Sequence, residues 1–177
     1  MRLKGLLAPL DEIFRREQIK YAVIGGYAVA VWGEVRATRD IDLLCSAPDI
    51  GLLVGALAKA NMRFERRTGD FDDPVSEVVE IDISAEERTY VIDVLAGIRG
   101  APRGIVERAR QIALEGLVLP VASPEDTVLL KLLAGSRRDV DDALSIIRMQ
   151  AGRLDLALLR NLCPPNLKSA LDLLLRS

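Results

Sequence analysis

Two aspartates, Asp40 and Asp42, are separated by a single isoleucine inside a short apolar run. Residues two positions apart on a strand share a face, so this spacing predicts a strand with both carboxylates on one side and Ile41 and Leu43 facing the core. Two carboxylates on one face repel each other and are costly to desolvate. A hard divalent cation, which prefers oxygen ligands, is the usual solution. The spacing therefore predicts a metal site.

A pair of glycines precedes these aspartates. The apolar run Tyr21–Ile24 ends at Gly25 and Gly26, and a helix-like segment, Tyr27–Trp32, follows. A glycine turn that opens a helix offers backbone N–H groups to a phosphate. The alternative is a tight turn that only needs a positive φ. Together with the aspartates, the glycines predict a site for a metal and a nucleotide.

The composition excludes several classes of site. The chain has no histidine, which rules out Ser-His-Asp and Cys-His catalysis and histidine-ligated zinc. Its two cysteines, Cys45 and Cys163, are far apart and predict neither a zinc site nor a disulfide framework. The net charge of -2 gives no overall basic field for nucleic acid. We interpret two arginine groups as surface charge: Arg63, Arg66 and Arg67, and Arg103, Arg108 and Arg110.

Half of the residues are hydrophobic, so the chain can bury a sizeable core. No apolar run approaches the roughly 20 residues of a membrane span. The run Leu6–Leu10 is too short for a signal peptide. We therefore expect a soluble, cytoplasmic protein without a membrane partner.

The order of the predicted elements indicates the fold class. Strands and helices alternate first, hairpins follow, and the chain after Ser123, a predicted N-cap, is helical. This order predicts an α/β (α+β) fold, a mixed twisted sheet with flanking helices. We expect residues 1–121 to form the core and 122–177 a helical extension packed on it, with one single domain as the alternative. The predicted strands are 21–24, 40–45, 62–66, 77–83, 89–95, 111–114 and 117–121, and the predicted helices include 3–17, 27–32, 48–60, 139–150, 154–162 and 166–176.

The ordered set of motifs resembles the nucleotidyltransferase superfamily with the DNA-polymerase-β-type core. An apolar residue precedes Gly25-Gly26, a short helix follows, and Asp40-Ile41-Asp42 comes next. Asp93, in the predicted strand Tyr90–Leu95, resembles the third carboxylate of that superfamily. Residues 123–142 resemble a narrower branch, the small stand-alone nucleotidyltransferases related to abortive-infection and type IV toxin–antitoxin proteins. The resemblance covers the chain from about residue 21 to about residue 147.

The resemblance implies an enzyme that moves a nucleoside monophosphate from a nucleoside triphosphate, such as ATP, to an acceptor hydroxyl. Asp40, Asp42 and Asp93 would be the catalytic residues and would hold two Mg²⁺ ions, with Mn²⁺ as an alternative. Asp93 would instead be a general base if a single ion binds. The acceptor stays open among a protein, a tRNA and a small molecule, and a cognate toxin or antitoxin is an expected partner.

Nucleotide contacts are expected from Gly25, Gly26 and four further residues. Gly26 lacks the hydroxyl of the serine that the superfamily often has there. Arg36 and Thr38 precede the aspartates, where an arginine would grip phosphate or merely balance the carboxylates. Lys131 lies in an apolar helix, where it contacts the nucleotide or extends to solvent. Asp139 is a site residue in the resembling branch, or a helix cap.

Two aspartates compete for the third carboxylate. Asp82 shares a strand face with Glu80 in a polar, solvated setting, whereas Asp93 lies between Val91 and Leu95 on its face. A lone acid among apolar neighbours is costly unless it meets a cation. We therefore expect Asp93, and not Asp82, on the same side of the sheet as Asp40 and Asp42 and close enough for the three to share a metal pair.

Two further functions stay open. One is a non-catalytic module, antitoxin-like, that binds a nucleotide or a toxin. The other is a metal-dependent hydrolase that uses the same carboxylates. The intact set of three aspartates argues against the binding module, because a module freed from catalysis need not carry unpaired carboxylates.

Overall fold

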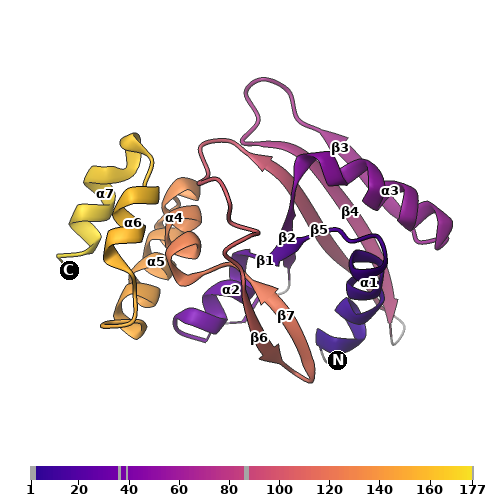
Figure 1. Cartoon of the computed structure of the whole chain (residues 1–177), viewed down its shortest axis with the longest axis horizontal. Helices are drawn as coiled ribbons and strands as arrows, with labels where there is room; N and C mark the ends of the chain where they lie inside the picture. The colour runs from indigo at the N-terminus through magenta and orange to yellow at the C-terminus, as the bar shows by residue number, and fades with distance from the viewer. Residues whose placement is uncertain (1–2, 36, 39, 86–87, 177) are drawn as a thin grey trace.

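The computed structural model describes residues 3–35, 37–38, 40–85 and 88–176 (Figure 1). The strands are β1 (Tyr21–Val23), β2 (Ile41–Cys45), β3 (Phe64–Thr68), β4 (Val75–Ala85), β5 (Arg88–Ile98), β6 (Arg110–Leu114) and β7 (Leu117–Val121). The helices are α1 (Leu3–Arg16), α2 (Gly25–Trp32), α3 (Ile50–Lys59), α4 (Pro124–Ala134), α5 (Arg137–Met149), α6 (Leu156–Leu162) and α7 (Lys168–Leu174), with 3₁₀ turns η1 (Ala47–Asp49) and η2 (Pro165–Leu167).

All of these strands belong to one mixed sheet with the order β3-β4-β5-β2-β1-β7-β6. β2 runs parallel to β5, and β1 runs parallel to β7, whereas the remaining neighbours are antiparallel. Figure 1 shows α1 and α3 on one side of the sheet and α4 to α7 gathered at the other end of the molecule. The predicted fold class, a mixed sheet with flanking helices, is therefore confirmed. The division at residue 121 stays a prediction.

One face of the central strands forms the core. Ile41 and Leu43 of β2, and Ile92 and Val94 of β5, are almost completely buried and belong to one hydrophobic cluster with α1 and α3. Strand alternation turns the intervening residues to the opposite face. A smaller cluster, which includes Leu44, covers part of that face. The rest of the face is left for polar side chains.

The observed elements match most of the predicted ones, with shifted ends. α1 continues through Pro9 without a break. β4 and β5 are each eleven residues long, longer than predicted, because they pair along nearly their whole length. None of the described helices combines the length and hydropathy needed to cross a bilayer.

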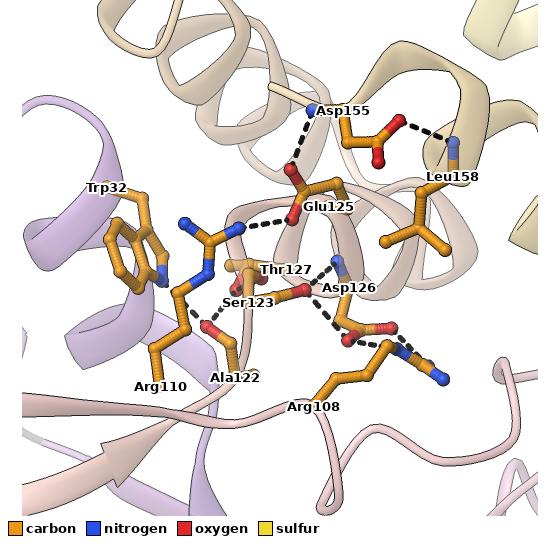
Figure 2. Close-up of polar contacts among 10 residues, drawn as sticks. All are labelled: Trp32, Arg108, Arg110, Ala122, Ser123, Glu125, Asp126, Thr127, Asp155 and Leu158. Atoms are coloured by element: carbon orange, nitrogen blue, oxygen red, sulfur yellow. Dashed lines mark hydrogen bonds and ion pairs between the residues drawn. The ribbon is translucent and has the colours of Figure 1, made fainter. Parts of the chain in front are cut away.

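A buried ionic anchor fixes the start of α4 (Figure 2). The predicted N-cap is confirmed, because the Ser123 hydroxyl accepts the N–H of Asp126. Arg108 forms two hydrogen bonds to the Asp126 carboxylate, at 3.0 and 2.7 Å, and the Asp126 side chain has no exposed surface. Arg110 pairs with the equally buried Glu125 at 3.2 Å. The segment before β7 is thereby tied to the helix that carries Lys131.

Candidate active site

Asp42 lies within β2, and Asp40 comes directly before it. Asp42 is half-buried and Asp40 is exposed, whereas Ile41 and Leu43 are 2% and 0% exposed. The predicted alternation is therefore confirmed around Asp42. Thr38, just upstream, donates its hydroxyl to the carbonyl of Asp40 at 3.4 Å, which fixes the approach to the strand. Arg36 lies outside the described residues.

Asp93 is the direct neighbour of Asp42 across the parallel pair of β2 and β5. Residues in register on adjacent strands point to the same face. Its Oδ1 atom is buried and has no hydrogen-bond partner among the described residues. Asp93 therefore shares the face of Asp42, as predicted, and has an unmet need for a positive partner.

Asp82 lies on the same face of the sheet, so the expectation that it would not is wrong, but it is farther from Asp42. It pairs in register with Val91 on β5, and its carboxylate forms an ion pair with Arg63 at 3.2 Å. The strand β5 separates it from β2. The expectation that Asp93 and not Asp82 adjoins Asp42 is thus confirmed. On its other side, Asp93 pairs in register with Glu80 of β4, a residue that the sequence analysis treated as part of an ordinary polar surface.

The carboxylates on this face disfavour one another's ionisation. Burial, and then the nearby Asp40, raise the pKa of Asp42, against the opposite effect of Lys131. Burial, followed by Asp42 and Asp40, raises the pKa of Asp93, and Arg67 opposes this. Each group would be stabilised in its charged form by a cation.

Oxygen ligands, burial and an unpartnered carboxylate oxygen suit a hard divalent cation. Among the described residues, however, no group of three acidic side chains is arranged to hold one metal ion. The sharing of metal ions by Asp40, Asp42 and Asp93 therefore stays a prediction. The fit rests on the chemistry of the donors and on the orphaned Asp93 oxygen.

The glycine turn packs directly against these acids. Gly25 has φ +63°, and a Cβ placed there would lie 1.9 Å from Asp42 Oδ2. A Cβ at Gly26 would lie 2.5 Å from Thr38 Oγ1. Close approach therefore requires glycine at both positions, and at Gly25 the positive φ requires it as well. The serine expected from the superfamily at the second position would displace Thr38.

Lys131 approaches the acids from α4. Its Nζ atom lies 2.7 Å from Asp139 Oδ1 and 3.1 Å from Asp142 Oδ2, and its side chain is 13% exposed. The ammonium group is therefore held inside the protein by two carboxylates, contrary to the alternative that it extends to solvent. Asp142 had no part in the sequence-based site, because its place beside Lys131 depends on the packing of α5 against α4.

Asp139 fills both of the roles considered for it. It forms a capping box with Ser136 at the start of α5 and also accepts a hydrogen bond from Lys131. Burial alone would raise the pKa of Asp139, but the hydrogen bonds from Lys131 and Ser136 lower it overall. Asp139 therefore remains ionised and fixes the position of Lys131.

A polar cavity of about 470 Å³ brings together the glycine turn, Asp40, Asp42, Lys131 and Asp139, whereas Asp93 and Asp142 do not line it. It adds one cation that the sequence reasoning missed, Arg138, whose neighbour Arg137 does not line the cavity. The arginine pair in the sequence could have drawn attention to this position, but not to which arginine faces inward. The lining residues are Gly25, Gly26, Ala37, Thr38, Asp40, Asp42, Lys131, Arg138 and Asp139.

A second cavity, of about 520 Å³, adjoins the first. Both cavities are lined by Gly25, Asp42 and Lys131, so these residues form the boundary between them. The second cavity lies between α4 and the ends of β4 and β5, and most of its lining is aliphatic. The site therefore has a polar half and an apolar half.

The two arginine groups do not form free basic patches. In the first group, Arg63, Arg66 and Arg67 pair with Asp82, Glu77 and Glu80. In the second, Arg108 and Arg110 pair with the buried acids at the start of α4. The interpretation of these arginines as structural surface charge agrees with these contacts.

The fold is shared with solved nucleotidyltransferases. ANT(2″)-Ia in complex with adenylyl-2″-tobramycin is 16% identical, with a TM-score of 0.62 over 88% of this chain and 93% of that one. An antigenic nucleotidyltransferase-like protein from Paracoccidioides brasiliensis is 21% identical, with a TM-score of 0.57 over 97% and 92%. The lincomycin-bound lincosamide antibiotic adenylyltransferase LnuA is 18% identical, with a TM-score of 0.51 over 85% and 98%.

No curated protein matches the chain in sequence. A family model described as "Nucleotidyltransferase of unknown function (DUF6036)" matches residues 1–172, nearly the whole chain. Together with the shared fold, this match confirms the resemblance suggested by the glycine turn and the aspartates. The chain belongs to this family of nucleotidyltransferases.

Proposed function

We propose that the chain transfers a nucleoside monophosphate, with ATP as the donor, to an acceptor hydroxyl in a Mg²⁺-dependent reaction. The observation that carries the proposal is the pairing of Asp42 with Asp93, whose buried oxygen has no partner among the described residues. This pair lies beside a glycine turn and a cavity with two cationic side chains. ATP is proposed because two proteins of similar fold are named as adenylyltransferases or were solved with an adenylylated product.

Asp40, Asp42 and Asp93 would hold two Mg²⁺ ions, with Mn²⁺ as the alternative. When bound, the ions would supply positive charge to the phosphate oxygens of an in-line displacement. Gly25 and Gly26 begin α2 and line the polar cavity, where their N–H groups would suit phosphate oxygens.

Lys131 and Arg138 add charge to the same cavity and hold the β- and γ-phosphates. The acceptor oxygen bonds to the α-phosphorus while the bond to the bridging oxygen of the β-phosphate breaks, and pyrophosphate leaves with that electron pair. Asp93 orients the acceptor hydroxyl, or takes its proton if a single ion binds. Catalysis then rests mainly on positioning and charge neutralisation.

The test uses ATP labelled at the α-phosphate, Mg²⁺ and a cell lysate as the source of acceptors. Wild-type protein should label an acceptor, and Asp40→Asn and Asp42→Asn should lose this labelling by at least about 100-fold while remaining folded. Near wild-type labelling by either variant would contradict the site.

A matched pair of arginine variants tests the polar cavity. Arg138→Ala should weaken ATP binding, whereas Arg137→Ala, one residue away and outside the cavity, should not. Equal effects of the two changes would exclude Arg138 as a phosphate contact. Labelled phosphate released from the γ position without acceptor labelling would indicate the hydrolase, and binding of ATP without either reaction would indicate the binding module.

The toxin–antitoxin setting remains a proposal that rests on the sequence resemblance alone. Expression of the chain in a bacterial host, with and without the products of its neighbouring genes, measures growth inhibition and its relief. Toxicity that depends on Asp42 and is relieved by a neighbouring gene product would support it. Absence of any growth effect would contradict it.

A further inference from the structure

We propose that the apolar cavity next to the polar one is the acceptor site, and that it selects a small hydroxyl compound with an uncharged, largely apolar body. The proposal rests on the nucleotidyl transfer inferred above and names the acceptor class for it. The cavity, of about 520 Å³, is within the range of sites for drug-sized molecules.

The position of the cavity assigns it to the acceptor. In an in-line displacement, the attacking hydroxyl and the leaving pyrophosphate lie on opposite sides of the α-phosphorus. The polar cavity has the glycine turn and the exposed cation Arg138, which suit the leaving phosphates. The apolar cavity lies on the other side of Asp42 and passes over Leu95, which shares a strand face with Asp93 two residues before it. Asp93 itself lines neither cavity, so an acceptor hydroxyl would approach the reacting phosphorus from this side past Asp42, which lines both.

The lining of the cavity defines the body of the acceptor. Six aliphatic side chains from four separate segments surround it: Ile24, Val75, Leu95, Ile98, Leu130 and Leu133. Covering such surfaces stabilises a bound molecule by about 25 cal/mol per Å² of apolar area removed from water. An apolar ring or chain therefore fits this space, whereas a highly hydrated body does not.

The two cations at the cavity, Lys131 and Arg99, also have partners within the protein. Lys131 is bound by Asp139 and Asp142. Arg99 donates to the carbonyls of Phe71 and Asp70 and stacks 5.3 Å from the Phe71 ring centre. These contacts hold the segment before β4 at the rim of the cavity.

Among the described residues that line the cavity, the charged ones are Asp42, which the reaction itself requires, and the cations Arg99 and Lys131. A polycationic acceptor would need additional carboxylates, and a nucleic acid would need a row of additional cations. The described lining supplies neither. The charge pattern therefore favours an uncharged acceptor over both.

The test compares three hydroxyl probes with labelled ATP and Mg²⁺: 4-phenylbutanol, the polycation tobramycin and a short RNA with a free 3′ hydroxyl. We expect 4-phenylbutanol to be labelled at least about tenfold faster than the other two, a difference of about 1.4 kcal/mol in transition-state stabilisation. Faster labelling of tobramycin or RNA, or no labelling of 4-phenylbutanol by a protein that binds ATP, would overturn the acceptor class.

Three variants locate the acceptor within the protein. Val75→Asp places a charge in the apolar cavity, and Val118→Asp makes the same change at an exposed strand position away from both cavities. Ala134→Phe fills the apolar cavity from an exposed position on α4. Val75→Asp and Ala134→Phe should lower labelling of 4-phenylbutanol at least tenfold and leave the rise in Tm caused by Mg²⁺ and ATP unchanged, whereas Val118→Asp should change neither.

The possible failures are distinguishable. Wild-type labelling by both cavity variants would show that the acceptor binds elsewhere. An equal loss of the ATP-induced Tm rise in both variants would assign the cavity to the nucleoside and overturn the proposal. If ATP with Mg²⁺ does not raise the Tm of the wild-type protein and labels no probe, the proposed function itself fails, and the acceptor site fails with it.

Discussion

Replacing Gly25 by alanine tests two properties of this glycine, its left-handed backbone conformation through stability and its close approach to Asp42 through activity. The residue has φ +63°, a conformation that costs an L-residue about 1–2 kcal/mol. For a chain of this size, each kcal/mol shifts Tm by about 2–4 °C. We therefore expect Gly25→Ala to lower Tm by about 2–8 °C and to leave the protein folded.

The loss of activity should be much larger than the loss of stability suggests. The new methyl carbon would lie 1.9 Å from Asp42 Oδ2, and real Cβ contacts essentially never fall under 3.0 Å, so the carboxylate must retreat by the difference. Displacement of a reacting group by about 1 Å can reduce a rate about 100-fold. Transfer of labelled AMP should therefore fall by about two orders of magnitude, while the unfolding transition stays cooperative.

The matched control is Gly55→Ala in α3. A Cβ at Gly55 meets no atom within 4 Å, so this change should raise stability by about 0.5–1 kcal/mol and leave transfer unaltered. Both variants are compared by thermal unfolding and by initial rates at saturating ATP. A rate for Gly25→Ala within about threefold of the wild-type rate corresponds to less than about 1 kcal/mol in activation free energy. Such a result would show that the close approach to Asp42 has no catalytic consequence.

Three further changes test the electrostatics. Burial, followed by Asp42, raises the pKa of Asp93. Between the lower pKa of the unfolded chain and the higher pKa of the folded chain, the folded state binds more protons at this group. Stability therefore falls as pH rises from the unfolded pKa through the folded one. Asp93→Asn should therefore have a higher Tm than wild type at neutral pH without metal, and the difference should vanish below about pH 4; equal Tm values at neutral pH would contradict this. Lys131→Ala should lose about 1.5–3 kcal/mol in urea unfolding because Asp139 and Asp142 both lose a charged hydrogen-bond donor, and it should blunt the Tm rise caused by Mg²⁺ and ATP. An unchanged Tm rise would argue against a phosphate contact. Arg108→Ala should cost about 3 kcal/mol or more in the same urea experiment, because it strips the partner from a carboxylate with no exposed surface, and a loss under about 1 kcal/mol would refute the anchoring role.

Features that depend on near neighbours in sequence were predictable. The alternation around Asp42, the turn at Gly25 and the cap at Ser123 each follow from strand geometry, backbone freedom or a side-chain hydrogen bond within a few residues. The ends of β4 and β5 were less predictable, because cross-strand pairing extended both strands beyond their clearest patterns.

The environment of Lys131 could not be predicted from the helical spacing of apolar residues around it. This lysine lies in an apolar helix, and the sequence left two interpretations open for it. The packing of α5 against α4 brings Asp139 and Asp142 to its ammonium group, and the same packing places Arg138 at the polar cavity. Contacts between helices of this kind depend on how the helices cross, which a single sequence does not display.

By itself, the sequence predicted the residue types of the candidate site: carboxylates on one strand face, a glycine turn before them, and a third acid on a later strand. Only the tertiary structure decided how these parts meet. The parallel register of β2 and β5 sets Asp93 against Asp42 and places Asp82 one strand farther away. The two cavities that meet at Asp42 are likewise a product of α4 lying over the sheet. Such arrangements depend on contacts between residues far apart in the chain, whereas the chemistry depends on the residue types and their local spacing.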